Sequence, residues 1–346
     1  MKGPLSVLVR APNWVGDVVI SLPALRAVRA AFPDAALTVL ARPWVAEAYR
    51  RERAVDAVMP HCAEAGVGDW SGKWRLAQSL RRRSFDCAIL FQNAFEAALL
   101  ARLAGIPRRI GYARDGRGFL LTDAIPVPRR GEIPRHESYY YLELLCRAGF
   151  LAELPPMDVI ELDRREEARA AGRVRFAEAG IGGEVLGISP GAAFGSAKRW
   201  PPERFAAAAH QVAAERPMSV AVFGSAAERP LCAAVAGVIE TAGSPVKNFA
   251  GETSLGEFIE LAAACAVFLT NDSGAMHIAS ALGVPTVAVF GSTDPWATGP
   301  KGRRTRVVRE PLDCSPCKLR ECPIDHRCMT RVPAGVVAHA ALELLP

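Results

Sequence analysis

An aspartate follows the first apolar run of the sequence, at a position where a catalytic base can act. Asp17 ends the segment 12–17, which comes directly after the apolar residues 5–9. Gly16 permits a tight turn, so Asp17 is expected in the first turn of the next helix. There it could take the proton of an attacking hydroxyl as a general base. An acid at the start of a helix is ordinarily a cap or a partner of the helix dipole, so this residue alone leaves both interpretations open.

Residues 189–201 have the composition of a phosphate-binding loop. Glycines such as Gly195 let the backbone approach an anion, and Lys198 supplies a positive charge. The segment contains neither Gly-x-Gly-x-x-Gly nor a Gly-Lys-Ser/Thr ending, so it is neither of the two common phosphate loops. It predicts a phosphate contact at Lys198. The neighbouring Arg199 and Trp200 are equally compatible with packing beneath the loop.

Residues 270–279 carry a second candidate anion site, where an apolar run gives way to a helical pattern. Asp272 or Ser273 can cap that helix, and the free N–H groups around Gly274 can bind a diphosphate. His277 lies one turn further along, on the face that Ser273 occupies. A lone histidine is more often a hydrogen-bonded packing residue than a catalytic one, so its spacing raises the odds of a functional role only modestly.

Two more turns fit a nucleotide site. Residues 223–228 and 290–295 each follow an apolar run with a glycine and a polar turn. Glu228 could accept hydrogen bonds from ribose hydroxyls, as acidic residues do in dinucleotide-binding folds. It could equally be an acid at the start of a helix.

Short apolar runs alternate with amphipathic ones, which is typical of parallel strands joined by helices. The predicted strands are residues 5–9, 37–41, 87–91, 185–189, 219–223, 267–270 and 286–290. The fold class is therefore α/β, with a doubly wound sheet in each half of the chain. Ligands of such sheets bind beyond the carboxyl ends of the strands, where all the segments above are placed.

A length of 346 residues exceeds the usual size of one hydrophobic core and predicts two domains. Prolines favour an extended chain over residues 154–163, and a polar helix is predicted over residues 164–179. We therefore expect one domain over residues 1–165 and a second over residues 166–330, followed by a C-terminal helical segment at 331–346.

Composition narrows the class of protein. The chain is 50% hydrophobic and 23% charged, as globular proteins are, and its formal net charge is +6. Much of the excess charge lies in arginine clusters of the first half, namely Arg50, Arg51 and Arg53, Arg81–Arg83, Arg108, Arg109, Arg114 and Arg117, and Arg129 and Arg130. These clusters favour a partner rich in phosphate or carboxylate, although each alone is compatible with a solvated surface. The absence of a recognition motif argues against nucleic acid.

The sequence has neither a signal peptide nor a run of about 18 apolar residues. It therefore predicts a cytoplasmic protein whose membrane association is peripheral.

Four of these motifs together resemble the heptosyltransferases of lipopolysaccharide core synthesis, glycosyltransferase family 9, over nearly the whole chain. The resemblance is greatest to the members that add the second heptose. The motifs are residues 12–17, 190–201, 271–277 and 290–295. Singly none of them is specific, but their joint spacing is.

The resemblance implies the GT-B fold, in which two Rossmann-like doubly wound domains face each other across a cleft. Residues 1–165 would bind the acceptor and residues 166–330 the nucleotide-sugar donor, and the C-terminal helix would cross back to the first domain. The implied reaction moves L-glycero-D-manno-heptose from ADP-heptose onto a heptosylated Kdo-lipid A acceptor at the inner face of the inner membrane, with inversion at the anomeric carbon.

The resemblance also implies residue roles. Asp17 matches the catalytic base and Lys198 the lysine that binds the donor phosphates. Glu228 would bind the ribose and Asp272 the sugar hydroxyls, while Ser273, Gly274 and His277 would complete the donor site. No Asp-x-Asp motif occurs, so no metal that bridges the diphosphate is expected, and no cofactor is required.

Four cysteines crowd together near the C-terminus, with His326 among them: Cys314, Cys317, Cys322 and Cys328. Such spacing can supply a tetrahedral zinc site. Only the first pair has Cys-x-x-Cys form, so reduced thiols, or disulfides formed after isolation, are together favoured over structural zinc. We assign the segment no catalytic role.

Other functions fit part of the same pattern. Another family 9 heptosyltransferase, I or III, would differ in its acceptor. A nucleotide-sugar epimerase of the same fold would consume donor without an acceptor. A noncatalytic nucleotide-binding protein would tolerate loss of Asp17, and a dehydrogenase is disfavoured by the missing glycine motif. The sequence does not indicate the oligomeric state.

Overall fold

The computed structural model describes residues 6–62 and 68–345, which form two compact units that meet at residues 157 and 158. This division falls a few residues before the boundary expected near residue 165. The extended linker belongs to the second unit, because Ile160 N–H donates to Lys301 O at 2.7 Å and Leu162 N–H to Ala281 O at 2.9 Å. No helix among the described residues is both long and apolar enough to span a membrane.

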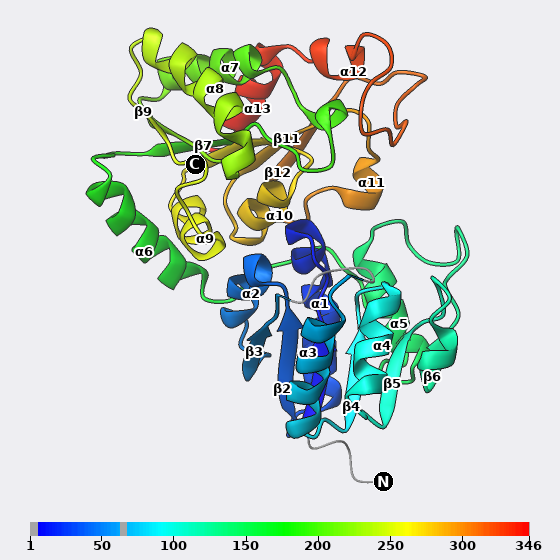
Figure 1. Ribbon diagram of the computed structural model, residues 1–346. Helices are drawn as coiled ribbons and strands as arrows, with labels where there is room; N and C mark the ends of the chain where they lie inside the picture. Colours follow the sequence, from blue (N-terminus) through cyan, green and yellow to red (C-terminus); the bar gives the residue numbers. More distant parts are fainter. Residues whose placement is uncertain (1–5, 63–67, 346) are drawn as a thin grey trace. The chain divides into compact units, whose positions relative to one another are not determined.

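The first unit is a parallel sheet with helices on both faces (Figure 1). Its strands lie in the order β3-β2-β1-β4-β5-β6. Helices α1 and α5 pack together, as do α3 and α4. The elements are β1 (Ser6–Arg10), α1 (Val15–Ala31), β2 (Ala36–Ala41), α2 (Pro43–Arg50), β3 (Ala57–Pro60), α3 (Trp70–Arg82), β4 (Cys87–Leu90), α4 (Phe95–Leu103), β5 (Arg108–Tyr112), the 3-10 turn η1 (Gly118–Leu120), β6 (Asp123–Ile125) and α5 (Ser138–Arg147).

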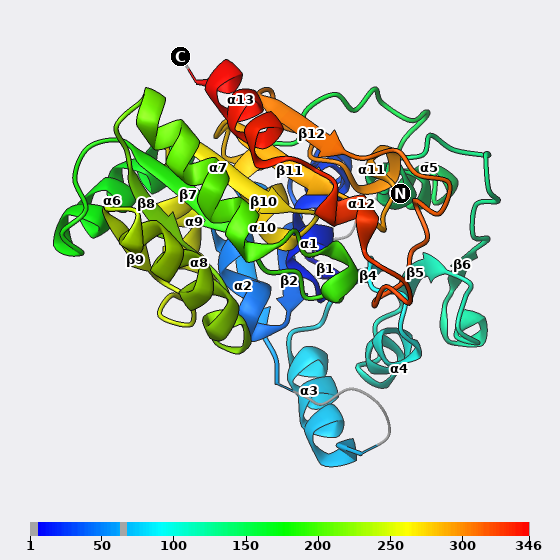
Figure 2. The same cartoon turned by 90° about the horizontal axis from the view of Figure 1, so that it is seen from above.

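The second unit repeats this plan, with strand order β12-β11-β10-β7-β8-β9. Helices α7, α8 and α13 pack together, and α9 packs against both α6 and α10 (Figures 1 and 2). The elements are α6 (Arg165–Glu178), β7 (Val185–Ser189), η2 (Ser196–Lys198), α7 (Pro202–Glu215), β8 (Ser219–Val222), η3 (Ala226–Glu228), α8 (Arg229–Thr241), β9 (Val246–Asn248), α9 (Leu255–Ala263), β10 (Val267–Asn271), α10 (Gly274–Ala281), β11 (Thr286–Phe290), α11 (Pro295–Thr298), β12 (Thr305–Arg309), α12 (Arg327–Thr330) and α13 (Ala334–Leu344).

Both sheets have the Rossmann strand order, which confirms the predicted fold class. In each, the order reverses between two neighbouring central strands, β1 and β4 in the first unit and β7 and β10 in the second. Loops that leave the carboxyl ends of such strands diverge to opposite faces and open a crevice for ligands. Asp17, Lys198 and Asp272 all lie just after strands at these two switch points.

The predicted strands are all present, within one residue at each end, apart from Leu5, which lies outside the described residues. Five strands were not predicted, namely β3, β5, β6, β9 and β12. The final helix, for which a return to the first domain was expected, is part of the second unit. Its apolar face, including Val337 and Ala341, is buried in the core that α7 and β11 also line, and the predicted last residue, Pro346, is not among those described.

Two mid-helix glycines test the packing of the second unit. A Cβ on Gly172 of α6 would lie 1.9 Å from the carbonyl oxygen of Glu260 in α9, whereas a Cβ on Gly237 of α8 would meet nothing within 4 Å. Gly172→Ala should therefore destabilise the second unit by about 2 kcal/mol, since the helices must separate. Gly237→Ala should stabilise it by about 0.5–1 kcal/mol through helix propensity. Thermal unfolding followed by circular dichroism measures both, and shifts of the same sign would contradict the close approach of α6 and α9.

Candidate active site

Asp17 lies in the first turn of α1, as predicted, and is half-buried. The residue before the helix, Trp14, makes no side-chain cap. Asp17 is the one acid in the first turn of α1. Two buried phenols, those of Tyr49 and Tyr141, interact electrostatically with Asp17. Burial raises the pKa of each phenol well above the usual range, and the negative charge of Asp17 raises it further. Both phenols therefore stay neutral beside the carboxylate.

The loop before Asp17 is held by the last residue of β1 and by a residue of α2. Arg10, the last residue of β1, donates from Nη2 to Asn13 Oδ1 at 3.0 Å, and the Trp44 indole N–H donates to Asn13 O at 2.9 Å. Arg10 is only 2% exposed. Burial, and then the charge of Arg42, lowers the pKa of Arg10 to about 10, so it remains charged at neutral pH. No motif in the sequence predicts a role for Arg10, although its place in an otherwise apolar strand is a signal that could have marked it.

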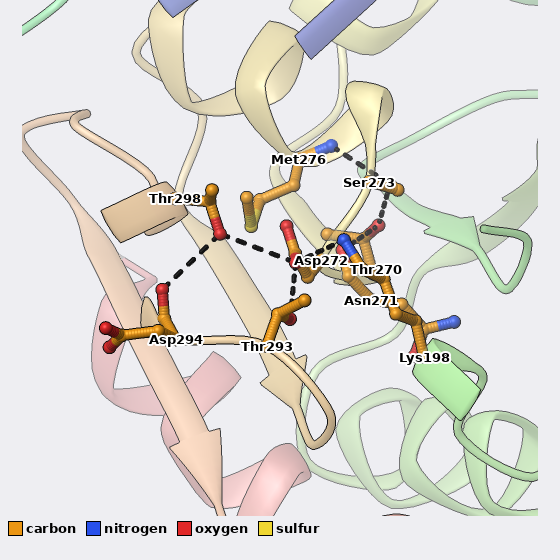
Figure 3. Close-up of polar contacts among 9 residues, drawn as sticks. All are labelled: Lys198, Thr270, Asn271, Asp272, Ser273, Met276, Thr293, Asp294 and Thr298. Carbon is orange, nitrogen blue, oxygen red and sulfur yellow. Dashed lines mark hydrogen bonds and ion pairs between the residues drawn. The ribbon is translucent and has the colours of Figure 1, made fainter. Parts of the chain in front are cut away.

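Lys198 and Asp272 form a buried ion pair in the second unit. Lys198 Nζ lies 2.6 Å from Asp272 Oδ2, and the two side chains are 13% and 5% exposed. The same oxygen accepts from the Thr293 hydroxyl at 2.5 Å, and the Thr298 hydroxyl lies 3.5 Å away (Figure 3). Two loops predicted to be functional, those at residues 189–201 and 270–279, thus meet at one carboxylate. Their sequences did not indicate this pairing, nor the role of the two threonines.

Asn271 holds these two loops together. Its side chain is fully buried, its amide NH₂ donates to Pro190 O at 2.7 Å, and its amide oxygen accepts from Trp200 N–H at 3.0 Å. Trp200 is itself fully buried and donates from its indole to Val332 O at 3.2 Å. Trp200 is therefore a packing residue, which resolves the alternative that the sequence left open.

The helix α10 begins beside the ion pair. Ser273 is its N-cap, with the hydroxyl 3.5 Å from Met276 N–H and 3.1 Å from the Thr270 hydroxyl (Figure 3). Gly274 is the first helical residue, so its N–H and those of the next three residues have no acceptor within the helix. His277 is 6% exposed and lies one turn further along the same helix. This end of α10 combines partial positive charge with the ammonium of Lys198.

Glu228 lies beside the loop that leads to Lys198. One carboxylate oxygen, Oε2, accepts from Ser225 N–H at 2.9 Å and from the Ser225 hydroxyl at 2.8 Å. The other, Oε1, faces Gly191, where an added Cβ would lie only 2.0 Å from it. Half of this carboxylate thus caps the short helix η3, and the other half faces the loop after β7. We call one set of residues the second-unit site: Lys198, Glu228, Asp272, Ser273, Gly274, His277, Thr293 and Thr298.

The four clustered cysteines are free thiols: Cys314 and Cys317 are exposed, Cys322 is half-buried and Cys328 is buried. Over residues 6–62 and 68–345, no three His, Cys, Asp or Glu side chains are arranged to hold a metal ion. The possible zinc site inferred from the spacing of these cysteines thus receives no support from their geometry.

Two Rossmann-like domains, one with a carboxylate and one with a buried lysine and a helix N-terminus at the switch point, are the architecture of a GT-B glycosyltransferase. Residues 73–327 match the model of glycosyltransferase family 9 (heptosyltransferase). The chain belongs to this family and is a glycosyltransferase.

Individual relatives agree with this assignment. The chain is 32% identical to lipopolysaccharide heptosyltransferase 2 of Escherichia coli (strain K12) over 312 residues, or 88% of both chains. It is 29% identical to lipooligosaccharide heptosyltransferase 2 of Haemophilus influenzae, also over 88% of both chains. Among solved structures, E. coli ADP-heptose lipopolysaccharide heptosyltransferase II is similar to it with a TM-score of 0.83 and 30% identity, over 98% of both chains.

Replacing Asn271 tests how the second-unit site is assembled. Asn271→Ala leaves the buried Pro190 carbonyl and Trp200 N–H without their partner, so it should lower the free energy of unfolding by about 3 kcal/mol. Ser280→Ala is the matched control, because the buried Ser280 hydroxyl donates to the helical carbonyl of His277 and its loss should cost less than about 1 kcal/mol. Urea unfolding compares the two variants, and equal losses would show that Asn271 does not join the loops.

Proposed function

We propose that the protein is an inverting heptosyltransferase that transfers L-glycero-D-manno-heptose from ADP-heptose to a heptosylated Kdo-lipid A acceptor. The observation that carries this proposal is the buried Lys198–Asp272 pair at the N-terminus of α10, a site suited to the diphosphate of a nucleotide-sugar. The relatives named lipopolysaccharide heptosyltransferase 2 support the choice of sugar and acceptor.

The donor diphosphate would lie between Lys198 and the first turn of α10. When the sugar leaves, the electron pair of the bond between the anomeric carbon and the phosphate oxygen stays on ADP. Lys198 and the N–H groups from Gly274 onward would stabilise this developing charge. Ser273 would contact the same phosphates, and His277, on the same helix face, would border them.

The sugar and the nucleoside would be held by the two acids. Asp272 lies within reach of Lys198, Thr293 and Thr298, and as a hydrogen-bond acceptor it suits the hydroxyls of the heptose. Glu228 keeps Oε2 on Ser225, which orients the carboxylate and leaves Oε1 for a ribose hydroxyl. Both acids would therefore position the donor without taking part in proton transfer.

Asp17 would act as the base. It would take the proton of the acceptor hydroxyl as that oxygen attacks the anomeric carbon on the face opposite to ADP, which inverts the configuration. Its place in the first turn of α1, after the strand at the switch point of the first sheet, supports this role. General-base catalysis of this kind contributes about 10²–10⁴-fold to a rate.

A lipid-anchored acceptor requires the protein to work at a membrane surface, and the first unit has features that suit it. Its exposed large aromatic side chains follow the carboxyl ends of strands β1 to β5: Trp14, Trp44, Trp70, Trp74, Phe95 and Phe119. Indole and phenyl rings partition to the bilayer interface, and the exposed Arg114, which follows β5, can attract anionic lipid. We therefore propose a peripheral location at the inner face of the inner membrane. At the clustered cysteines, thiols or disulfides were favoured over a structural zinc ion, and metal analysis of the purified protein would test this.

Asp17→Asn tests the reaction and the base together. The variant should bind ADP-heptose as the wild type does but release ADP about 10²–10⁴-fold more slowly, because the amide cannot accept the proton. Release is measured with heptosylated and with non-heptosylated inner-core lipid supplied separately, and only the heptosylated acceptor should support turnover.

Each alternative has its own result in this assay. Turnover with the non-heptosylated lipid would instead indicate a heptosyltransferase that acts earlier, and donor consumption without any acceptor would indicate an epimerase. Full activity of Asp17→Asn would exclude Asp17 as the base.

Trp70 and Trp74 test the membrane surface. They are 55% and 53% exposed and lie one turn apart on α3. Replacing both by alanine should reduce co-sedimentation with vesicles of phosphatidylethanolamine and phosphatidylglycerol about three- to tenfold, since two interfacial rings are lost. Trp296→Ala removes a 69%-exposed indole from the second unit and is the matched control. Equal binding of the wild type and the double variant would place the membrane contact elsewhere.

A further inference from the structure

The cysteine-rich segment, residues 312–328, is held against the loops of the second-unit site by backbone and side-chain hydrogen bonds. Lys318 N–H donates to Ser292 O at 2.7 Å, and the Ser315 hydroxyl donates to Gly291 O at 2.6 Å. Both acceptors lie in the turn that carries Thr293, one of the partners of Asp272. The segment is therefore part of the wall of this site, although it is distant in sequence from Lys198 and Asp272.

The same segment fixes the residue before Lys198. Ala197 N–H donates to Arg320 O at 2.9 Å, and Ala197 O lies 3.1 Å from Nε2 of His326. Both backbone polar groups of Ala197 are thus held by one segment. The contact is close, because a Cβ on Gly195 would lie 2.2 Å from Arg320 O.

The side chains of Arg320 and Lys198 both lie beside the Phe194 ring. The Phe194 ring has the Lys198 ammonium 4.8 Å and the Arg320 guanidinium 5.3 Å from its centroid. Arg320 is exposed. Within residues 6–62 and 68–345, no carboxylate forms an ion pair with it.

The charges already present in the second-unit site indicate why a second cation would matter for binding a diphosphate. Lys198 is already paired with Asp272 at 2.6 Å, so together they contribute no net charge. A nucleotide-sugar carries two negative charges on its diphosphate, and the departing nucleoside diphosphate gains a third. The N-terminus of α10 offers about half a positive charge. A further cation would therefore strengthen binding of the diphosphate, and Arg320 lies beside the same ring as Lys198.

We infer that Arg320 is a further donor-binding residue, whose guanidinium contacts the terminal phosphate of the nucleoside diphosphate and stabilises it as the sugar leaves. This inference rests on the proposed glycosyl transfer. As the acceptor oxygen forms its bond to the anomeric carbon, the bond from that carbon to the phosphate oxygen breaks. The acceptor proton goes to Asp17, and the electron pair goes to the phosphate beside Arg320 and Lys198.

Binding of ADP and of AMP to the full chain, measured by calorimetry, tests this role. Arg320→Gln should weaken ADP about three- to tenfold and AMP less than about twofold, because AMP lacks the terminal phosphate. Arg320→Lys should recover most of the loss, and kcat with ADP-heptose should fall in the glutamine variant as ADP binding does. Arg331→Gln, which changes another exposed arginine of the same unit, is the control and should leave both affinities unchanged.

The outcomes separate this inference from the proposed function. If the wild type releases ADP from ADP-heptose but Arg320→Gln binds ADP and AMP as the wild type does, Arg320 has no role and the transfer reaction stands. If Arg320→Gln weakens ADP and AMP equally, Arg320 acts only by holding the Phe194 loop, and the inferred phosphate contact is wrong. If the wild type does not bind ADP at all, the proposed function itself fails.

Discussion

A buried lysine and a buried aspartate impose the main constraint on the second unit. Lys198 and Asp272 are 74 residues apart in sequence, and their charged atoms lie 2.6 Å apart. Leaving either charge buried alone would cost several kcal/mol, so the loop after β7 and the end of β10 must stay together whenever no other ion is bound. A diphosphate can share the lysine without creating an unpaired charge, because Asp272 still accepts from Thr293. Asp272 therefore keeps a hydrogen-bond partner both with and without a bound diphosphate.

The repeated sheet order explains how one fold provides opposite chemistry in its two units. In each, the strand order reverses beside the first strand, β1 or β7, and the loop that leaves this strand carries the reactive group. In the first unit a buried arginine, Arg10, fixes the loop and an acid, Asp17, follows it. In the second unit a buried amide, Asn271, fixes the loop and a cation, Lys198, follows it. One unit can thus accept a proton and the other can stabilise an anion.

Sequence patterns predicted the central strands of both sheets and missed the four edge strands, together with the inner strand β5, for a physical reason. Strands β7 and β11 are covered on both faces, so all five residues of each are buried and apolar runs identify them. Strands β9 and β12 are the edge strands of the same sheet, and β12 has an arginine on each side of its two valines. Exposed positions admit charged residues, which removes the apolar run on which the prediction depended. The α/β class was recoverable because it depends on the central strands alone.

The sequence predicted the individual loops of the site but not the contacts that join them. Glycine, lysine and aspartate mark the single loops because their side chains do the chemistry. A contact such as that between the Arg320 carbonyl and Ala197 N–H uses only backbone atoms, which every residue except proline provides, so it leaves no trace in residue type. The cysteines marked this segment as a candidate zinc site, but their geometry in residues 6–62 and 68–345 does not support zinc binding. Because the backbone of Arg320 holds the loop while its side chain is exposed, the guanidinium can be changed without removing the link that positions Lys198.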